Sequence, residues 1–212
     1  MQPRGRPRNF DRDLALRAAM EVFWARGYEA TQVSDLIAAM EINPPSFYAA
    51  FQSKEAVYRE AVDLYLSTVG AASMRALQTR PDVISAFEAM LAAAIDLALC
   101  SASSGGCLVS LGLINAQPQN SALRDHMRDL RRTTVMLIRD RLMAGILDGE
   151  LPPDLDLDPM ARFFATVLHG LSLQAQDGAS AIELAGIAAV AVSTLPLNSN
   201  PCPAPRTDPV LP

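Results

Sequence analysis

The amino-acid sequence predicts an all-α protein of about nine helices. Apolar residues recur at three- and four-residue spacing through most of the 212-residue chain, as the buried stripe of a helix requires. No segment alternates apolar and polar residues in the manner of a half-buried strand. The breaks between the helical segments carry glycine, proline, asparagine or aspartate, and 50% of the residues are hydrophobic, which suffices for a buried core.

The first two helices are predicted in the segments 11–26 and "TQVSDLIAAMEI" (31–42). The first segment ends before Gly27, where a left-handed residue commonly terminates a helix. Thr31 is placed to cap the N-terminus of the second helix, and a break is expected at Glu41. The apolar stripes consist of Leu16, Ala19, Met20 and Phe23 in the first helix and of Val33, Leu36, Ile37 and Met40 in the second.

A third, short helix is predicted to begin at Asn43, a favourable N-cap residue. Pro44 and Pro45 follow in the first turn, where a missing N–H group removes no helical hydrogen bond. Phe47 and Phe51 lie four residues apart and therefore point one face of this helix inward.

A fourth helix is predicted from its N-cap Ser53 to about residue 80, because no helix breaker occurs before Arg80 and Pro81. A single helix of this length can connect two domains. The remaining helices are predicted at about 82–103, 106–116, 119–147, 159–176 and 179–195, with Asp158 as the N-cap of the fourth of these and Pro159 in its first turn.

Charge is unevenly distributed along the chain. The formal net charge is -5, but residues 1–60 contain 8 basic and 8 acidic residues, whereas residues 61–212 contain 10 and 15. All the net acidity therefore lies downstream of residue 60, and the N-terminal part can approach a polyanion.

No run of roughly 20 apolar residues suited to crossing a membrane occurs, and the N-terminus lacks the apolar core of a signal peptide. Cys100, Cys107 and Cys202 are too few and too irregularly spaced for a disulfide framework or a four-ligand zinc site. These features predict a cytoplasmic protein without a metal site.

Two short helices joined by a tight turn and preceded by a supporting helix form a helix-turn-helix, whose second helix enters the DNA major groove. In this helix the small Pro45 and Ser46 would allow close approach to base edges, and the Tyr48 hydroxyl can contact a phosphate. Lys54, the only lysine, lies in the first turn of the next helix, where free N–H groups already favour a phosphate. The arginines Arg4, Arg6 and Arg8 form a basic arm suited to the minor groove, or alternatively a solubilising terminus.

Residues 10–60 resemble the tetracycline-repressor (TetR) family of bacterial transcriptional regulators. The resemblance rests on "AAMEVFWARGYEATQVSDLIAAMEINPPSFYAAFQSKEAVY". It implies phosphate contacts from Gln32, Tyr48 and Lys54 and base-facing positions at Ser34, Pro45, Ser46 and Ala49. The family usually has glycine where Glu41 and Gln52 stand, and a larger polar contact residue where Ala50 stands.

The resemblance implies that the C-terminal helices bind a small effector and form a homodimer. The last two helices are apolar on more than one face, which favours covering by a second copy, although burial within one chain is the alternative. Residues that would project between helices are candidates for the effector pocket, and ordinary core positions are the alternative for each. These candidates are Phe87, Met90, Leu111, Asn115, Met136, Phe163 and His169.

The predicted organisation is a basic flexible arm (1–9), a helix-turn-helix DNA-binding domain (10–55), a helical effector-binding and dimerisation domain (56–195) and a disordered proline-rich tail (196–212).

The expected function is that of a transcriptional regulator, namely a repressor that a small molecule releases from a palindromic double-stranded DNA operator. The alternative is a helical apolar-ligand carrier or protein-interaction module without DNA readout. An enzyme is not expected, because no catalytic motif occurs, and neither is a cofactor. Oxidation sensing by Cys100 or Cys107 stays open.

Overall fold

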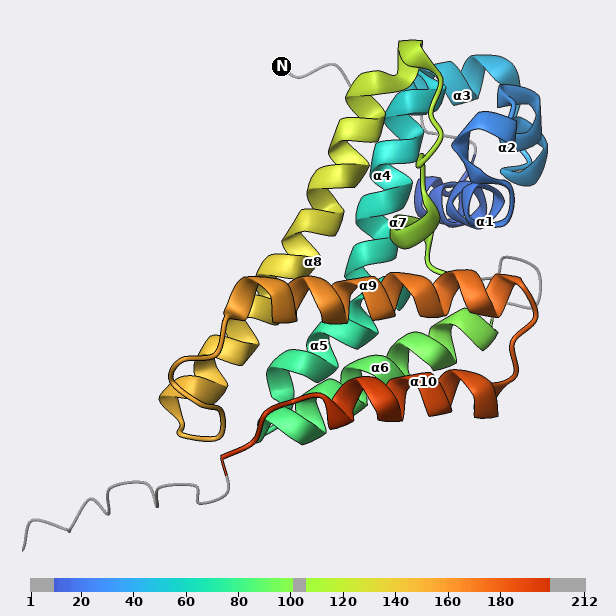
Figure 1. Cartoon of the computed structure of the whole chain (residues 1–212). Helices are drawn as coiled ribbons and strands as arrows, with labels where there is room; N and C mark the ends of the chain where they lie inside the picture. The colour runs from blue at the N-terminus through green and yellow to red at the C-terminus, as the bar shows by residue number, and fades with distance from the viewer. Residues whose placement is uncertain (1–9, 101–105, 199–212) are drawn as a thin grey trace, which may run out of the picture.

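The structure is a computed structural model that describes residues 10–100 and 106–198 (Figure 1). Within these ranges it has ten α-helices, nine of them with seven residues or more, two short 3-10 helices and no strand. The predicted all-α fold is confirmed. The predicted basic arm lies outside the described residues, as does the predicted tail from residue 199 onward.

Four helices build the N-terminal part: α1 (Arg12–Ala30), α2 (Val33–Ala39), α3 (Pro44–Phe51) and α4 (Lys54–Ser67). Their core is rich in aromatic rings that meet edge to face. The ring centroid of Tyr58 on α4 lies 4.9 Å from that of Phe23 and 5.0 Å from that of Tyr28. Such pairs stabilise a core beyond their buried area, so they fix α4 against α1.

The predicted starts of α3 and α4 are confirmed. The Asn43 side-chain oxygen accepts a hydrogen bond from the Ser46 N–H at 2.8 Å, and Pro44 and Pro45 occupy the first turn. The Ser53 hydroxyl accepts from the Ala56 N–H at 3.0 Å. Both caps satisfy N–H groups that have no partner inside the helix.

The predicted cap of α2 is wrong. Thr31 is buried, and its hydroxyl donates to the Gly27 carbonyl at 2.7 Å, so it closes the end of α1 instead. Gln32 is the residue that precedes α2, and the Asp35 carboxylate accepts its N–H at 2.8 Å. Gly27 interrupts α1 with φ 73 and ψ 169, a conformation that essentially only glycine adopts, and one further turn reaches Ala30.

The single long helix expected from Ser53 to about residue 80 is also wrong. The α4 helix ends at Ser67, and the chain turns at Thr68 (φ -119, ψ -105) into the 3-10 helix η1 (Val69–Ala71) and then α5 (Ala72–Thr79). This turn brings Gly70 against the Tyr65 ring, where a side chain would collide with it. The Thr68 hydroxyl donates to the Leu64 carbonyl at 2.6 Å, which satisfies one of the carbonyls left without a partner at the end of α4.

The rest of the chain forms α6 (Val83–Cys100), α7 (Leu108–Leu111), the 3-10 helix η2 (Pro118–Asn120), α8 (Ser121–Leu147), α9 (Leu157–Gln176) and α10 (Ala181–Ser193). The α9 helix lies across α6 and α10 (Figure 1). Buried side chains of α5, α6, α8, α9 and α10 form a second core. A separate first core joins α1 to α4 with α7 and the start of α8.

By length and composition α6 could cross a membrane, because its 18 residues have a mean hydropathy of 1.9. Its apolar face, however, packs into the second core through Phe87, Met90 and Leu91, which are fully buried. Contacts with α5, α9 and α10 cover this face. We therefore read α6 as the central helix of a helical domain.

The helix predicted over 106–116 is shortened to α7. Gly112 follows α7 and is packed so closely that a side chain there would collide with the Leu108 carbonyl. The Arg131 guanidinium donates to the Val109 and Gly112 carbonyls at 3.0 Å each. These carbonyls are therefore satisfied by a side chain from α8, and the backbone is free to turn.

The predicted N-cap of α9 is wrong as well, since this helix begins at Leu157 after Asp156. Asp158 lies inside the first turn, and its carboxylate accepts from the Arg139 guanidinium at 2.8 Å. Residues 196–198, expected in the tail, are packed against the loop after α8. The Asn198 side-chain amide donates to the Gly149 and Leu151 carbonyls at 2.8 and 3.0 Å.

Candidate nucleic-acid interface and ligand cavity

The inner face of α3 is fixed by its neighbours. Phe47 and Phe51 are buried in the first core. The Arg12 guanidinium lies 4.6 Å from the centre of the Phe51 ring, forms an ion pair with Glu60 at 2.6 Å and donates to the Ala50 carbonyl at 3.3 Å. One arginine thus ties α1, α3 and α4 together, and the opposite face of α3 must face solvent.

The residues expected at a DNA interface are accessible where the structure describes them. Tyr48 has 54% of its surface exposed, with its ring edge to face on Phe47 at 5.3 Å. Ser46 and Lys54 are half-buried, and the other members of the set are exposed: Gln32, Ser34, Pro45 and Ala49. Arg4, Arg6 and Arg8 lie outside the described residues. The helix-turn-helix therefore presents one accessible, small-residue face with a phenol and an ammonium group beside it.

Lys54 begins α4, where its ammonium nitrogen lies 4.1 Å above the centre of the Tyr28 ring. Partial burial lowers the pKa of Lys54, while the charges of Glu29 and Asp35 oppose that shift. The start of α4 also has N–H groups without a partner inside the helix. Both features favour an anion at this corner of the helix-turn-helix.

Two turns of this region carry residues other than glycine in left-handed conformations. Glu41, between α2 and α3, has φ 53. Gln52, between α3 and α4, has φ 64 and ψ -51, and the Ser53 N–H donates to the Phe51 carbonyl at 2.7 Å across it. This is a γ-turn of the strained kind. The turns thus keep the positive φ suited to glycine and carry a strain of about 1–2 kcal/mol per residue.

A cavity of about 140 Å³ lies between the end of α4 and the helices α5 to α9. Its walls are mainly apolar and carry a few hydroxyl groups, one thiol and one imidazole. At one end the Tyr65 hydroxyl lies 3.3 Å from the Cys107 sulfur, in hydrogen-bonding contact. The lining residues are Tyr65, Leu66, Gly70, Ser73, Met74, Ala94, Leu97, Cys107, Val109, Ser110, Leu130, Thr133, Thr134, Leu137, Leu168, His169 and Ser172.

Of the residues suggested by sequence for the effector pocket, His169 alone lines this cavity. Phe87 and Met90 are fully buried in the second core, and Asn115, Met136 and Phe163 are exposed. Leu111 is half-buried beside Gly106. A signal for the true lining exists on α8, where Leu130, Thr133, Thr134 and Leu137 share one helical stripe that lines the cavity.

Both cysteines within the described ranges are free thiols. Cys100 is exposed at the end of α6, whereas Cys107 is half-buried in the cavity wall. Cys202 lies outside the described residues. Among the residues that the structure describes, no group of three or more His, Cys, Asp or Glu side chains could hold a metal ion.

Comparison with known proteins decides the family. Residues 15–61 match the family "Bacterial regulatory proteins, tetR family", and residues 84–188 match "Tetracyclin repressor-like, C-terminal domain". The HTH-type transcriptional repressor ComR of Escherichia coli K12 is 30% identical over 91% of this chain and 92% of its own length. The chain belongs to the TetR family. It is a DNA-binding helix-turn-helix transcriptional regulator, and a regulator of this family is not an enzyme.

Two further TetR-family relatives cover most of the chain. The repressor BdcR of Escherichia coli K12 is 27% identical over 88% of this chain and 90% of its own length. The regulator CifR, solved with a 26-bp double-stranded operator, is 40% identical, covers 90% of this chain and 100% of its own, and superposes with a TM-score of 0.86. The family resemblance stated from residues 10–60 therefore extends through the larger C-terminal part.

Sequence reasoning missed the residues that join the TetR-type DNA-binding helices to the cavity wall. The Trp24 indole N–H donates to the Gly106 carbonyl at 2.9 Å, and its ring meets the Tyr65 ring edge to face at 5.2 Å. The Glu29 carboxylate accepts from the Gln117 N–H and the Asn120 side-chain amide, both at 2.9 Å. The segment 106–120 is therefore bonded to α1 at both ends while its middle lines the cavity.

Proposed function

We propose that this TetR-family protein is a repressor that binds a palindromic operator as a homodimer and is released when a small effector occupies the cavity. The observation that carries the proposal is the disposition of α3. Its inner face is locked by Phe47, Phe51 and Arg12, while Tyr48 and Lys54 remain accessible at its border. A helix held in this way can read a major groove without losing its position.

The base-facing set of the proposal is Ser34, Pro45, Ser46 and Ala49, with phosphate contacts from Gln32, Tyr48 and Lys54 and minor-groove contacts from Arg4, Arg6 and Arg8. Names of relatives support repression as the direction of control, since ComR and BdcR are described as repressors and CifR was solved with operator DNA. The protein would act in the cytoplasm, where the operator lies.

The dimer is proposed to form through α9 and α10. Large apolar side chains stand exposed on these two helices: Phe163, Leu173, Ile182, Ile187 and Val190. Gly170 and Gly186 have no other group within 4 Å of where a side chain would begin, so a second backbone can approach closely there. A monomer would expose this surface to water, and a twofold copy would cover it.

Effector control is proposed to run through the segment 106–120. Cys107, Val109 and Ser110 from this segment line the cavity, while its neighbours Gly106 and Gln117 are bonded to α1. An occupant that displaces α7 would therefore pull on α1 and on the α3 helix that Arg12 ties to it. The coupling energy of such systems is typically 1–3 kcal/mol.

The test uses the double variant Tyr48→Phe with Lys54→Met, which keeps both side-chain volumes and removes one hydroxyl and one charge. We expect its affinity for the DNA flanking its own gene to fall at least tenfold, because hydrogen bonds to charged groups contribute about 1.5–3 kcal/mol each. The slope of log affinity against log salt concentration should become shallower by about one, because one fewer phosphate is neutralised. Gel-shift titrations at several salt concentrations measure both quantities.

The control is Arg75→Met, which removes one exposed positive charge from α5, away from α3. It should leave operator affinity within twofold of the wild type. If the double variant and the control bind DNA equally well, or if no sequence-selective binding occurs at all, the reading as an operator-binding repressor is overturned. The apolar-ligand carrier would then account for the cavity.

A further inference from the structure

A groove of about 350 Å³ between α8 and α9 is lined by arginines. Its walls are Arg128, Arg131, Arg132, Val135, Arg162, Ala165, Thr166 and His169. No carboxylate belongs to this lining, although residues 61–212 contain 15 acidic and 10 basic residues. Four guanidinium groups therefore converge in the acidic part of the molecule, which calls for a functional explanation.

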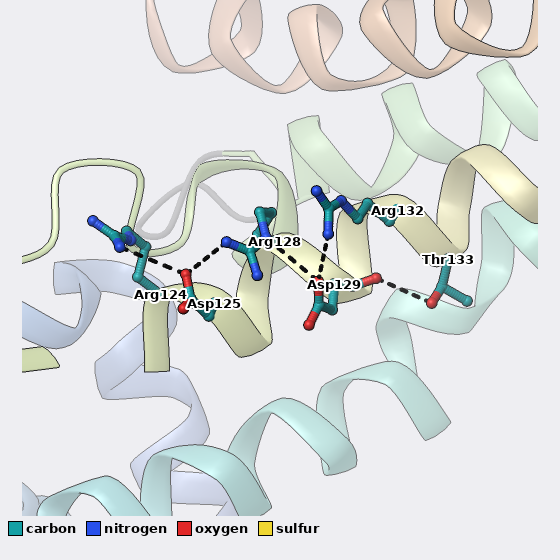
Figure 2. A network of polar contacts seen from close by, with 6 residues as sticks. All are labelled: Arg124, Asp125, Arg128, Asp129, Arg132 and Thr133. Atoms are coloured by element: carbon teal, nitrogen blue, oxygen red, sulfur yellow. Dashed lines mark hydrogen bonds and ion pairs between the residues drawn. The ribbon is translucent and has the colours of Figure 1, made fainter. Parts of the chain in front are cut away.

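The arginines of the groove are only partly neutralised. Arg128 pairs with Asp125 at 2.7 Å and with Asp129 at 3.4 Å, and Arg132 pairs with Asp129 at 3.2 Å. All these pairs lie along the exposed side of α8 (Figure 2). Such exposed pairs contribute only about 0–1 kcal/mol, so the guanidinium groups can turn to a better partner.

The two other arginines have no carboxylate partner among the described residues. Arg131 is half-buried and donates to the Val109 and Gly112 carbonyls, which satisfy its N–H groups without cancelling its charge. Arg162 is exposed, and its guanidinium has no hydrogen bond or ion pair within the described part of the chain. The groove therefore keeps a net positive charge.

The groove and the cavity meet at His169, which lines both. Burial lowers the pKa of His169, and the charge of Arg131 lowers it further, so the imidazole is neutral at neutral pH. A neutral imidazole can donate or accept a hydrogen bond beside a polar group that passes it. The apolar cavity and the cationic groove thus share His169 as one wall residue.

We propose that the effector is an amphiphilic anion whose apolar body fills the cavity while its carboxylate or phosphate head binds the arginines of the groove. This inference rests on the proposed effector-controlled function and specifies the chemical class of the effector. The cavity of about 140 Å³ is close to the engineered cavity of about 150 Å³ that binds benzene, so the body has about six carbon atoms. Guanidinium groups bind carboxylates and phosphates through paired hydrogen bonds, and a cationic head would be repelled.

The test compares hexanoate and hexyl phosphate with the neutral hexanamide, using calorimetric titration of the full chain. At least one of the anions should bind tenfold or more tightly than the amide, and the tighter anion identifies the head group. Arg162→Gln should remove most of this preference. The matched control Arg124→Gln lies on α8 outside the groove and should retain it.

Occupancy of the cavity has an independent readout, because Cys107 lines it. In a variant with Cys100→Ser and Cys202→Ser, the preferred anion should slow alkylation of Cys107 by iodoacetamide at least fivefold. No slowing would place the anion outside the cavity and overturn the inference.

Two further outcomes would overturn the inference while leaving the repressor function intact. Equal binding of anions and amide would mean that the arginines do not select the head group. Dissociation of the dimer by Arg162→Gln with unchanged anion preference would assign the groove to carboxylates of a second copy. Operator binding in the absence of any ligand is measured separately and tests the repressor function by itself.

Discussion

Gln52 shows how a single residue can carry strain at a functional turn. Its φ of 64 and ψ of -51 place it in a γ-turn between the recognition helix α3 and α4. The family resemblance alone raised the question of this position, because glycine usually stands there. The structure answers it: the turn has the positive φ that suits glycine, and the glutamine backbone is strained.

We expect Gln52→Gly to raise the free energy of unfolding by about 0.5–1 kcal/mol, because the relief of left-handed strain exceeds the extra chain entropy of glycine. Thermal or urea denaturation measures the change. Gln78→Gly is the matched control, since Gln78 is exposed within α5 and its replacement should lower stability by about 1 kcal/mol. A destabilised Gln52→Gly variant would show that the turn is not strained.

The accessible face of the helix-turn-helix was predictable because caps and amphipathic spacing are local properties. Asn43, Pro44 and Ser53 determine where α3 and α4 begin, and the buried Phe47 and Phe51 leave Tyr48 outside. The cavity residues were not predictable in the same way. A methionine or phenylalanine on an apolar stripe has the same local signature whether it meets another side chain, as Phe87 meets Phe164 at 4.3 Å, or empty space.

Among the elements, the segment 106–120 departs from the sequence expectation and carries the contacts on which the proposed effector control rests. A helix was expected over 106–116, but α7 covers only Leu108–Leu111. Donors and acceptors from other helices replace the missing helical hydrogen bonds. Arg131 on α8 donates to two carbonyls, and Glu29 on α1 accepts from two N–H groups. Sequence periodicity contains no information on such distant partners.

We expect Glu29→Gln to loosen this segment, because a neutral amide accepts hydrogen bonds less strongly than a carboxylate. Hydrogen–deuterium exchange of peptides from 106–120 should become faster, while Glu21→Gln, a change at an exposed position on the same helix, should have no effect. Unchanged exchange in both variants would show that Glu29 does not hold the cavity wall against α1.

The same contact predicts a dependence on pH. Hydrogen bonds from Asn120 and Gln117 lower the pKa of Glu29 below its usual range. A depressed pKa means that the contact stabilises the fold above the pKa of the unfolded chain and is lost as the pH falls through the folded value. Exchange in 106–120 should therefore accelerate on acidification in the wild type but not in Glu29→Gln.

At the level of the whole molecule, the proposed dimer would place two copies of α3 on one operator. Val190 on α10 has 68% of its surface exposed and lies among other exposed apolar side chains. A carboxylate placed at this position would be buried without a partner in the proposed dimer, which is strongly unfavourable.

We expect Val190→Asp to yield a monomer in light scattering coupled to size-exclusion chromatography, and to lose most of its affinity for a two-half-site operator. Leu147→Asp is the control, because Leu147 is also an exposed apolar residue, at 79%, but ends α8. It should remain dimeric. A dimeric Val190→Asp would exclude α10 from the interface.

The sequence by itself determined the all-α architecture, the starts of α3 and α4, the accessible face of the helix-turn-helix and the family, because all of these follow from local spacing, capping and short motifs. The folded arrangement decided the break at Thr68, the inward turn of Thr31, the shortened α7, the cavity and the arginine groove. The shortened α7, the cavity and the groove depend on groups that approach from distant parts of the chain, such as Arg131 to Gly112 or Arg162 to Arg128. Local periodicity records which side of a helix is apolar, whereas the packing between helices decides which neighbour, or which empty volume, that side meets.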